Sequence, residues 1–221
     1  MAAIQKLIRL KTAAGMLLLF ASLGLVRAEV IDRIAATVGR QVITESQVVE
    51  EIRVTALLDG KAPDWSDGNR SKTLNRLVDQ LLVRKEIDAT RFPEASAADG
   101  AKLLEQLKTT TPDFASKLAG LHLSEAIVQK HLEWQVTFLR FVEFRFKPGV
   151  EVSDADLKDF YATQVKEWKK ESKPVPEFDA VKGDLERLLT SKYVDQALDR
   201  WLGDQRTETA IVFKNDKKGQ P

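Results

Sequence analysis

The chain of 221 residues contains no cysteine, which excludes disulfide bonds, thiolate metal sites, a cysteine nucleophile and a lipid-modified N-terminal cysteine. Histidine is scarce as well, because His122 and His131 are the only two. Neither has another ligand type at metal spacing, so we expect structural roles for both and no metal site. The sequence has no G-x-S-x-G motif and no P-loop. We therefore predict no catalytic residues and no cofactor.

An excess of charge of either sign is also missing, since 34 basic residues stand against 33 acidic ones. This balance argues against a nucleic-acid-binding protein, which carries a basic surface. Charged residues make up 30% of the chain and hydrophobic residues 43%. These proportions are typical of a folded protein with a buried core and charged helical surfaces, and a chain of this length can fold on packing alone.

The first 28 residues differ from the rest. Basic residues precede an apolar stretch over 12–26, and Val26–Arg27–Ala28 provides the residues expected before a cleavage site. This pattern predicts a secretory signal peptide at 1–28, because a membrane anchor needs about 20 apolar residues. The leader holds four of the 34 basic residues and no acidic one, which leaves 30 basic against 33 acidic residues. We expect the mature chain to bind neither anionic membranes nor nucleic acid by charge alone, and to make no stable membrane insertion.

Two short β-prone segments, 33–38 and 41–44, follow the leader and are separated by Gly39–Arg40. A two-residue link that begins with glycine suits a tight hairpin turn. Thr44 and Gln47 have the spacing of a capping box, so a helix is expected from there to Leu58.

The remaining sequence is predominantly helical by its apolar periodicity and its caps. The predicted helices span 71–92, 96–108, 113–119, 124–146, 153–170 and 178–206, with loops at 59–69, 147–149 and 171–177. A short apolar strand is predicted at 209–213, and 214–221 is predicted to be a disordered tail. An isolated hairpin is marginal in water, so we expect the final strand to join it in a three-stranded antiparallel sheet. The predicted fold class is mainly α, a helical core closed by this sheet.

The helix predicted over 124–146 is amphipathic. One face carries the apolar residues Ile127, Val128, Leu132, Phe138, Leu139 and Val142. The opposite row carries Lys130, Glu133, Thr137 and Arg140, and we expect it to face solvent. Phe144 occupies the next place in that polar row.

Four segments, in order, resemble the SurA N-terminal domain family of periplasmic chaperones. Ile43–Thr44–Glu45–Ser46–Gln47 is similar to the family's I-T-x-S-[DE] helix start, and 75–87 (NRLVDQLLVRKEI) to its L-I-x-x-x-L-L-x-x-E helix. Residues 150–164 are similar to the segment that leads into a parvulin prolyl-isomerase domain. Residues 176–213 resemble the helix and strand that complete the chaperone core.

The chain departs from the family between Phe146 and Phe178, where only about 30 residues replace the roughly hundred of a parvulin domain. The His-containing strand and the G-G-x-L-G segment of that domain are missing there, so we expect no enzyme. The resemblance implies a SurA N-terminal-like helical domain at 29–147, completed by 148–213.

The resemblance implies a periplasmic, ATP-independent chaperone that holds unfolded or nascent envelope proteins, outer-membrane proteins among them. One alternative is a non-catalytic envelope adaptor with a single folded partner, and a weaker one is a peptidyl-prolyl isomerase. The sequence does not indicate an oligomeric state.

Three aromatic residues stand where apolar side chains are out of place: Trp65 in a polar loop, Phe144 in a polar row and Trp168 in a charged segment. A holdase needs exposed apolar surface, so we predict that these three contact clients. The alternative is that each covers a neighbouring helix. By contrast, Trp134, Phe138, Phe141 and Trp201 are expected in the core, and the acidic pair Glu50–Glu51 is expected to be solvated.

Overall fold

The computed structural model describes residues 32–214, and the described residues from Arg33 onward belong to one compact unit. The predicted leader, 1–28, lies outside the described residues, as does the predicted tail beyond Lys214. The strands are β1 (Ile34–Val38), β2 (Gln41–Thr44) and β3 (Ile211–Phe213). The helices are α2 (Glu45–Leu58), α3 (Asp67–Thr90), α4 (Ala97–Thr110), α5 (Phe114–Gly120), α6 (Glu125–Phe146), the 3-10 helix η1 (Lys147–Gly149), α7 (Asp154–Lys170) and α8 (Phe178–Glu208).

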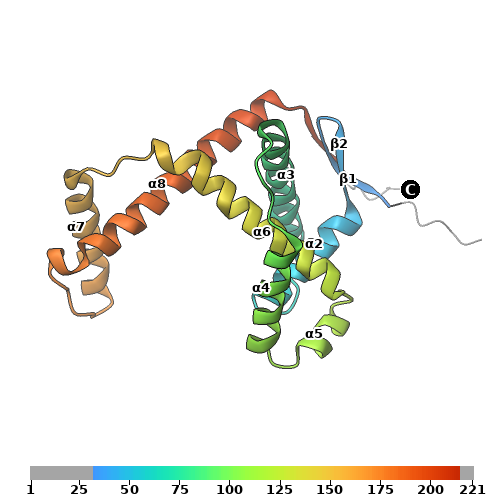
Figure 1. Cartoon of the computed structure of the whole chain (residues 1–221), viewed down its shortest axis with the longest axis horizontal. Helices are drawn as coiled ribbons and strands as arrows, with labels where there is room; N and C mark the ends of the chain where they lie inside the picture. Colours follow the sequence, from blue (N-terminus) through green and yellow to red (C-terminus); the bar gives the residue numbers. More distant parts are fainter. Residues whose placement is uncertain (1–31, 215–221) are drawn as a thin grey trace, which may run out of the picture. The chain divides into compact units, whose positions relative to one another are not determined.

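The prediction of a mainly helical fold closed by a small sheet is confirmed. The strand order is β2-β1-β3 with both pairings antiparallel, so the C-terminal strand pairs with the N-terminal hairpin (Figure 1). Gly39 turns the hairpin at φ 58°, a left-handed conformation that glycine adopts without strain. Its N–H donates to the carbonyl of Ala210 at 2.8 Å, and the N–H of Lys214 donates to Ala35 at 2.8 Å.

The inner face of the sheet packs on α2 and α3. Buried Ala36, Val38 and Ile43 from the hairpin share one apolar cluster with residues of both helices, among them Val48 and Leu82. Ile211 of β3 packs against the same cluster. The hairpin therefore obtains both the third strand and the helical support that a short hairpin needs.

The C-terminal end of α8 is attached to α3 by one arginine. Arg206 Nε donates to Asp79 Oδ1 at 2.7 Å, and its Nη2 donates to the Asn75 carbonyl at 3.0 Å. These groups are partly buried, so the contacts fix α8 beside α3 just before the chain enters β3.

Two apolar clusters lie along α6. Toward its N-terminal end, Val128 and Leu132 pack with Val54 of α2 and with residues of α4 and α5. Toward its C-terminal end, Trp134 and Phe141 pack with residues of α3 and α8 in a second cluster. The expected core placement of Trp134 and Phe141 agrees with their burial.

The polar row of α6 faces solvent only in part, because α4 packs against it: Lys130 and Arg140 are exposed, whereas Thr137 is not. Thr137 is buried, and its hydroxyl accepts the N–H of Ala95 at 2.9 Å. Arg140 Nη2 pairs with Asp99 Oδ1 of α4 at 3.0 Å. Helical periodicity identifies a polar face, but a neighbouring helix with small residues and polar partners can still pack on it.

The apolar face of α6 also departs from the prediction at one place. Leu139 belongs to the predicted apolar face, yet it is 65% exposed. It borders a cavity between α6 and α8 that Val142 and Val194 also line.

Helix α7 packs against the N-terminal half of α8 and forms a separate apolar cluster (Figure 1). Leu157, Leu185 and Leu189 are buried in it. The hydroxyl of Tyr161 donates to the carbonyl of Pro176 at 2.8 Å, which ties α7 to the loop before α8. Because α8 also contributes Leu198 and Trp201 to the cluster around α6, this one helix joins both parts.

Helix α3 begins at Asp67, four residues before the predicted start at Ser71. Ser66 caps it by accepting the N–H of Asn69 at 3.2 Å, and the first-turn carboxylate of Asp67 suits the positive end of the helix dipole. Gly68 led us to predict a loop, but the cap offsets its low helix propensity.

Ending the chain after Glu208 removes β3 and should lower the melting temperature by about 4–8 °C, through a loss of about 2 kcal/mol. Thermal melting followed by circular dichroism measures the change. A chain ending after Lys214 keeps β3 and is the matched control. Equal melting temperatures for the two truncated chains would contradict a stabilising role for β3.

Gly100→Ala should destabilise the protein by about 1–2 kcal/mol, because the new Cβ would lie 3.0 Å from the Gln129 carbonyl and even closer to Glu133. Gly183→Ala in α8 is the control, since no atom lies within 4 Å of its added Cβ, and it should stabilise by up to about 1 kcal/mol. Urea unfolding at neutral pH compares the two. A stabilised Gly100→Ala variant would show that α4 and α6 do not require this close approach.

Candidate functional site

A cleft between α2, α3 and α6 is the candidate site. It consists of two adjoining cavities of about 510 and 380 Å³, which share Gln80, His131 and Trp134 as lining residues. These volumes fall in the usual range of ligand sites. We call the two together the α2–α3–α6 cleft. The larger cavity also reaches Val42 and Ile43 of β2, so one end of the cleft adjoins the sheet.

The walls of the cleft combine apolar and hydrogen-bonding side chains. Leu77, Leu81 and Ile127 are half-buried in the larger cavity, and Leu58 and Phe138 line the smaller one. The polar lining residues of the larger cavity are Gln47, Glu50, Glu51, Gln80, Arg84, Lys130 and His131. Such a surface can hold an apolar side chain and also bond to a peptide backbone.

A buried carboxylate lies in the larger cavity. Glu51 is only 8% exposed, so the expectation that the pair Glu50–Glu51 is solvated holds for Glu50 and is wrong for Glu51. Its oxygens lie 3.3 Å from His131 Nδ1 and 3.2 Å from Arg76 Nε, and Gln80 donates to it at 3.4 Å. Buried charges are tolerated when they are paired and hydrogen-bonded in this way.

The pKa of Glu51 reflects these neighbours. Burial by itself raises the pKa, but the hydrogen bond from His131 and the charges of His131 and Arg76 more than offset it, so the pKa lies below the ordinary 4.5. Glu51 is thus a carboxylate at neutral pH, and its lone pairs are already occupied by neighbours.

Arg84 stacks on an aromatic ring at the side of the same cavity. Its guanidinium carbon lies 3.7 Å from the centroid of the Trp134 ring, within cation–π range. Burial lowers the pKa of Arg84, although nearby Glu94, Asp88 and Glu51 act to raise it. An arginine stays protonated under such conditions, so the cavity holds a partly desolvated cation.

The structure places the three predicted client-binding aromatics at three separate positions. Trp65 is 53% exposed and has the guanidinium of Arg53 5.9 Å from its ring centroid. Phe144 is 66% exposed and its ring lies 5.3 Å from that of Phe92. Trp168 is half-buried, and its ring is 6.1 Å from that of Tyr161 on the same helix.

These three do not form one surface. Trp65 precedes α3 and Phe144 packs on Phe92 beyond its other end, and a helix of 24 residues is about 36 Å long. Trp168 belongs to α7, which packs on α8. None of the three lines the α2–α3–α6 cleft. Their role in client binding stays a prediction.

Sequence reasoning missed the cleft because its residues come from three helices that are distant in sequence. One signal was present: Leu77, Leu81 and Arg84 share a face of α3 at helical spacing, so a cation continues an apolar stripe. Glu51 likewise stands between Val48 and Val54 at intervals of three residues.

Among residues 32–214, no cluster of three or more His, Asp or Glu side chains could hold a metal ion. Within the same range, no helix is both long and apolar enough to cross a membrane.

Neither a scan of family models nor a search of curated proteins gives a match to this chain. The resemblance to the SurA N-terminal domain family therefore rests on the four sequence segments alone.

Glu51→Gln should lower the free energy of unfolding by about 1–3 kcal/mol at neutral pH, because it removes a paired buried charge. Since the folded-state pKa lies below the ordinary 4.5, ionised Glu51 stabilises the fold above that pH, and this stabilisation is lost as the pH falls through the folded-state pKa. The difference between wild type and variant should therefore shrink on acidification from about pH 7 to about pH 3.

Urea unfolding over this pH range makes the measurement, and Glu50→Gln on the exposed side of the same helix is the matched control. An unchanged difference between wild type and Glu51→Gln at every pH would rule out the ion pair as its source.

Proposed function

We propose that the chain is an ATP-independent periplasmic holdase that binds unfolded or nascent envelope proteins, outer-membrane proteins among them, in the α2–α3–α6 cleft. The observation that carries the proposal is the composition of this cleft. Its two cavities adjoin at Gln80, His131 and Trp134, and together they offer a surface with both apolar and hydrogen-bonding groups.

An unfolded chain presents apolar side chains and unpaired backbone amides at the same time. Leu77, Leu81 and Ile127 can cover the side chains, while Gln47 and Gln80 can bond to the amides. The Oε1 of Gln47 already accepts the N–H of Thr44 at 2.9 Å in the cap of α2, so its side-chain N–H groups are the ones that can bond to a client. Contacts of this kind depend little on sequence, as promiscuous holding requires.

Exposed apolar side chains outside the cleft support weak binding at several points. Trp65, Phe144 and Leu139 are each more than half exposed, and Trp168 is half-buried. Each of these side chains contributes about 1 kcal/mol of binding free energy, after the entropic cost of ordering the client is subtracted. A long client that reaches several anchors binds more tightly than any one contact allows.

The charge around these anchors favours a soluble complex. Residues of both signs are interspersed, as in the pairs Arg140–Asp99 and Lys182–Asp154. Because the apolar side chains are separated and charged residues surround them, self-association of the protein is limited. The proposal requires no nucleotide and no catalytic step, so release occurs by exchange.

The first test dilutes a urea-unfolded outer-membrane protein into buffer with residues 29–221, which hold every described helix and strand, and follows light scattering. We expect suppression of aggregation near an equimolar ratio. Replacing Leu77 and Ile127 by Gln in the cleft should raise the amount of protein needed about tenfold, because two apolar contacts are lost.

Val175 and Leu188 are exposed apolar residues outside the cleft, and replacing both by Gln is the matched control. A third variant replaces Trp65, Phe144 and Trp168 by Ser, and its effect measures their share of client binding. Circular dichroism verifies that each variant is folded. Failure of the folded wild type to suppress scattering would reject the holdase and favour the adaptor with one fixed partner.

A further inference from the structure

Arg84 has hydrogen-bonding capacity that its surroundings in the described chain do not use. It lines the larger cavity of the α2–α3–α6 cleft and stacks on Trp134. Across residues 32–214 it makes no hydrogen bond and no ion pair. Its nitrogens are not among the buried unpartnered polar atoms of the described residues, so they reach solvent and are open to a ligand that enters the cavity.

The stacking geometry leaves the guanidinium ready to bind an anion. The Trp134 ring takes one face of the cation, whereas the N–H donors of arginine point outward in the plane of the group. A carboxylate can therefore approach the edge and form two parallel hydrogen bonds without displacing the ring.

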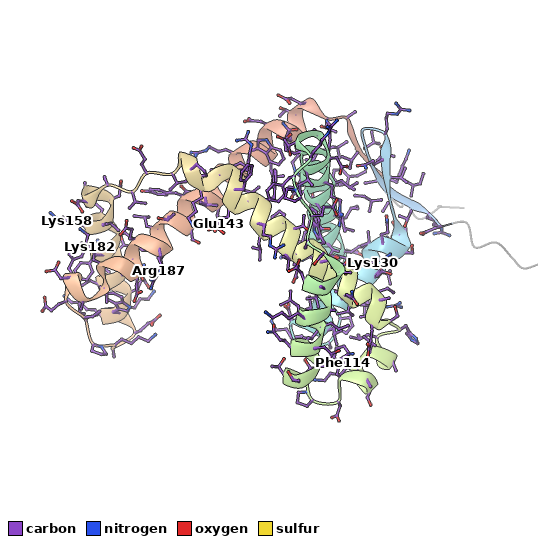
Figure 2. The ribbon with its side chains drawn as sticks, viewed as in Figure 1. Phe114, Lys130, Glu143, Lys158, Lys182 and Arg187 are labelled. Carbon is purple, nitrogen blue, oxygen red and sulfur yellow. The ribbon has the colours of Figure 1, made fainter. Side chains whose placement is uncertain are left out.

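The other charges of this cavity do not satisfy Arg84. Glu51 is committed to His131, Arg76 and Gln80. Glu50 also lines the cavity, but it is exposed, and among the described residues it pairs with neither Arg84 nor Lys130. Lys130 lines the cavity from α6, and Figure 2 labels it on the N-terminal half of that helix. Asp88 and Glu94 act on Arg84 only through space. Arg84 and Lys130 therefore leave two cations available in one cavity.

Apolar surface adjoins these cations. Leu77, Leu81 and Ile127 line the same cavity as Arg84, and Val42 and Ile43 of β2 border it on another side. A ligand that fits must carry a carboxylate and an apolar group close together.

We propose that this cavity binds the C-terminal end of a polypeptide, with the terminal carboxylate on Arg84 and the last side chain against Leu77, Leu81 and Ile127. This inference rests on the proposed function, because the polypeptides it concerns are the clients of the proposed holdase. It adds that the cavity recognises their C-terminal end.

A chain terminus fits better than an acidic side chain. The terminal residue carries its carboxylate and its side chain on the same carbon, so one group meets Arg84 while the other meets the apolar wall. An internal Asp or Glu would bring the backbone on both of its sides to the cavity, whereas a terminal residue brings it on one side only. Capture of a terminal carboxylate is a known mode of peptide recognition.

The experiment measures fluorescence anisotropy of a short labelled peptide that ends in an apolar residue, with residues 29–221 of this chain. The free-acid peptide should bind about tenfold more tightly than the same peptide with a C-terminal amide, as expected for a charge-assisted pair. Arg84→Met keeps an aliphatic contact with Trp134 and removes the charge, so it should bind both peptides equally. Lys72→Met on the same helix, outside the cleft, should keep the tenfold preference.

Equal binding of acid and amide by the wild type would overturn the inference, whatever the stability of the variants. An amidated peptide with one internal Glu that binds as tightly as the free acid would overturn it too, in favour of acidic side chains. Light scattering on the same samples separates the two proposals. Suppression without acid preference retains the holdase alone, and acid preference without suppression retains terminus binding alone.

Discussion

The arrangement depends on one constraint, that α6 has a different neighbour on each of its faces. Helix α4 packs on its polar row and also joins α2 and α5 against its N-terminal apolar residues. Helices α3 and α8 pack on its C-terminal apolar residues. The contact with α4 needs the missing side chain of Gly100 and the satisfied hydroxyl of Thr137. Where the two apolar clusters of α6 separate, the α2–α3–α6 cleft opens and Glu51 meets His131.

This constraint explains how much of the fold the sequence could predict. Caps and apolar periodicity identified each described α-helix, although not the 3-10 helix η1, and turn chemistry identified the hairpin, because these signals depend on residues close in sequence. The strand at 209–213 was predicted from its apolar residues, and its pairing was predicted from the need of the hairpin for a partner. The partner of the polar row of α6 was missed, because periodicity reports which side chains share a face and not which helix covers it.

The site was less predictable for a related reason. The burial of Glu51 follows from Arg76 on α3 and His131 on α6, and nothing within α2 indicates either partner. The stacking of Arg84 on Trp134 likewise joins two helices. Trp65, Phe144 and Trp168 were singled out by their local sequence alone, and local sequence cannot say that they lie apart. A cleft formed by three helices becomes apparent only when their packing is known.

The position of β3 also has a consequence for the order of folding. Residues 38 and 211 are partners in the sheet, so the contact that completes it closes a loop of nearly the whole described chain. Contacts of such long sequence separation form slowly, whereas helices and hairpins form within microseconds. During synthesis the hairpin emerges before β3. Until β3 pairs with it, β1 keeps one open edge. An open strand edge can pair with another chain, so the newly made protein is prone to aggregate at this stage.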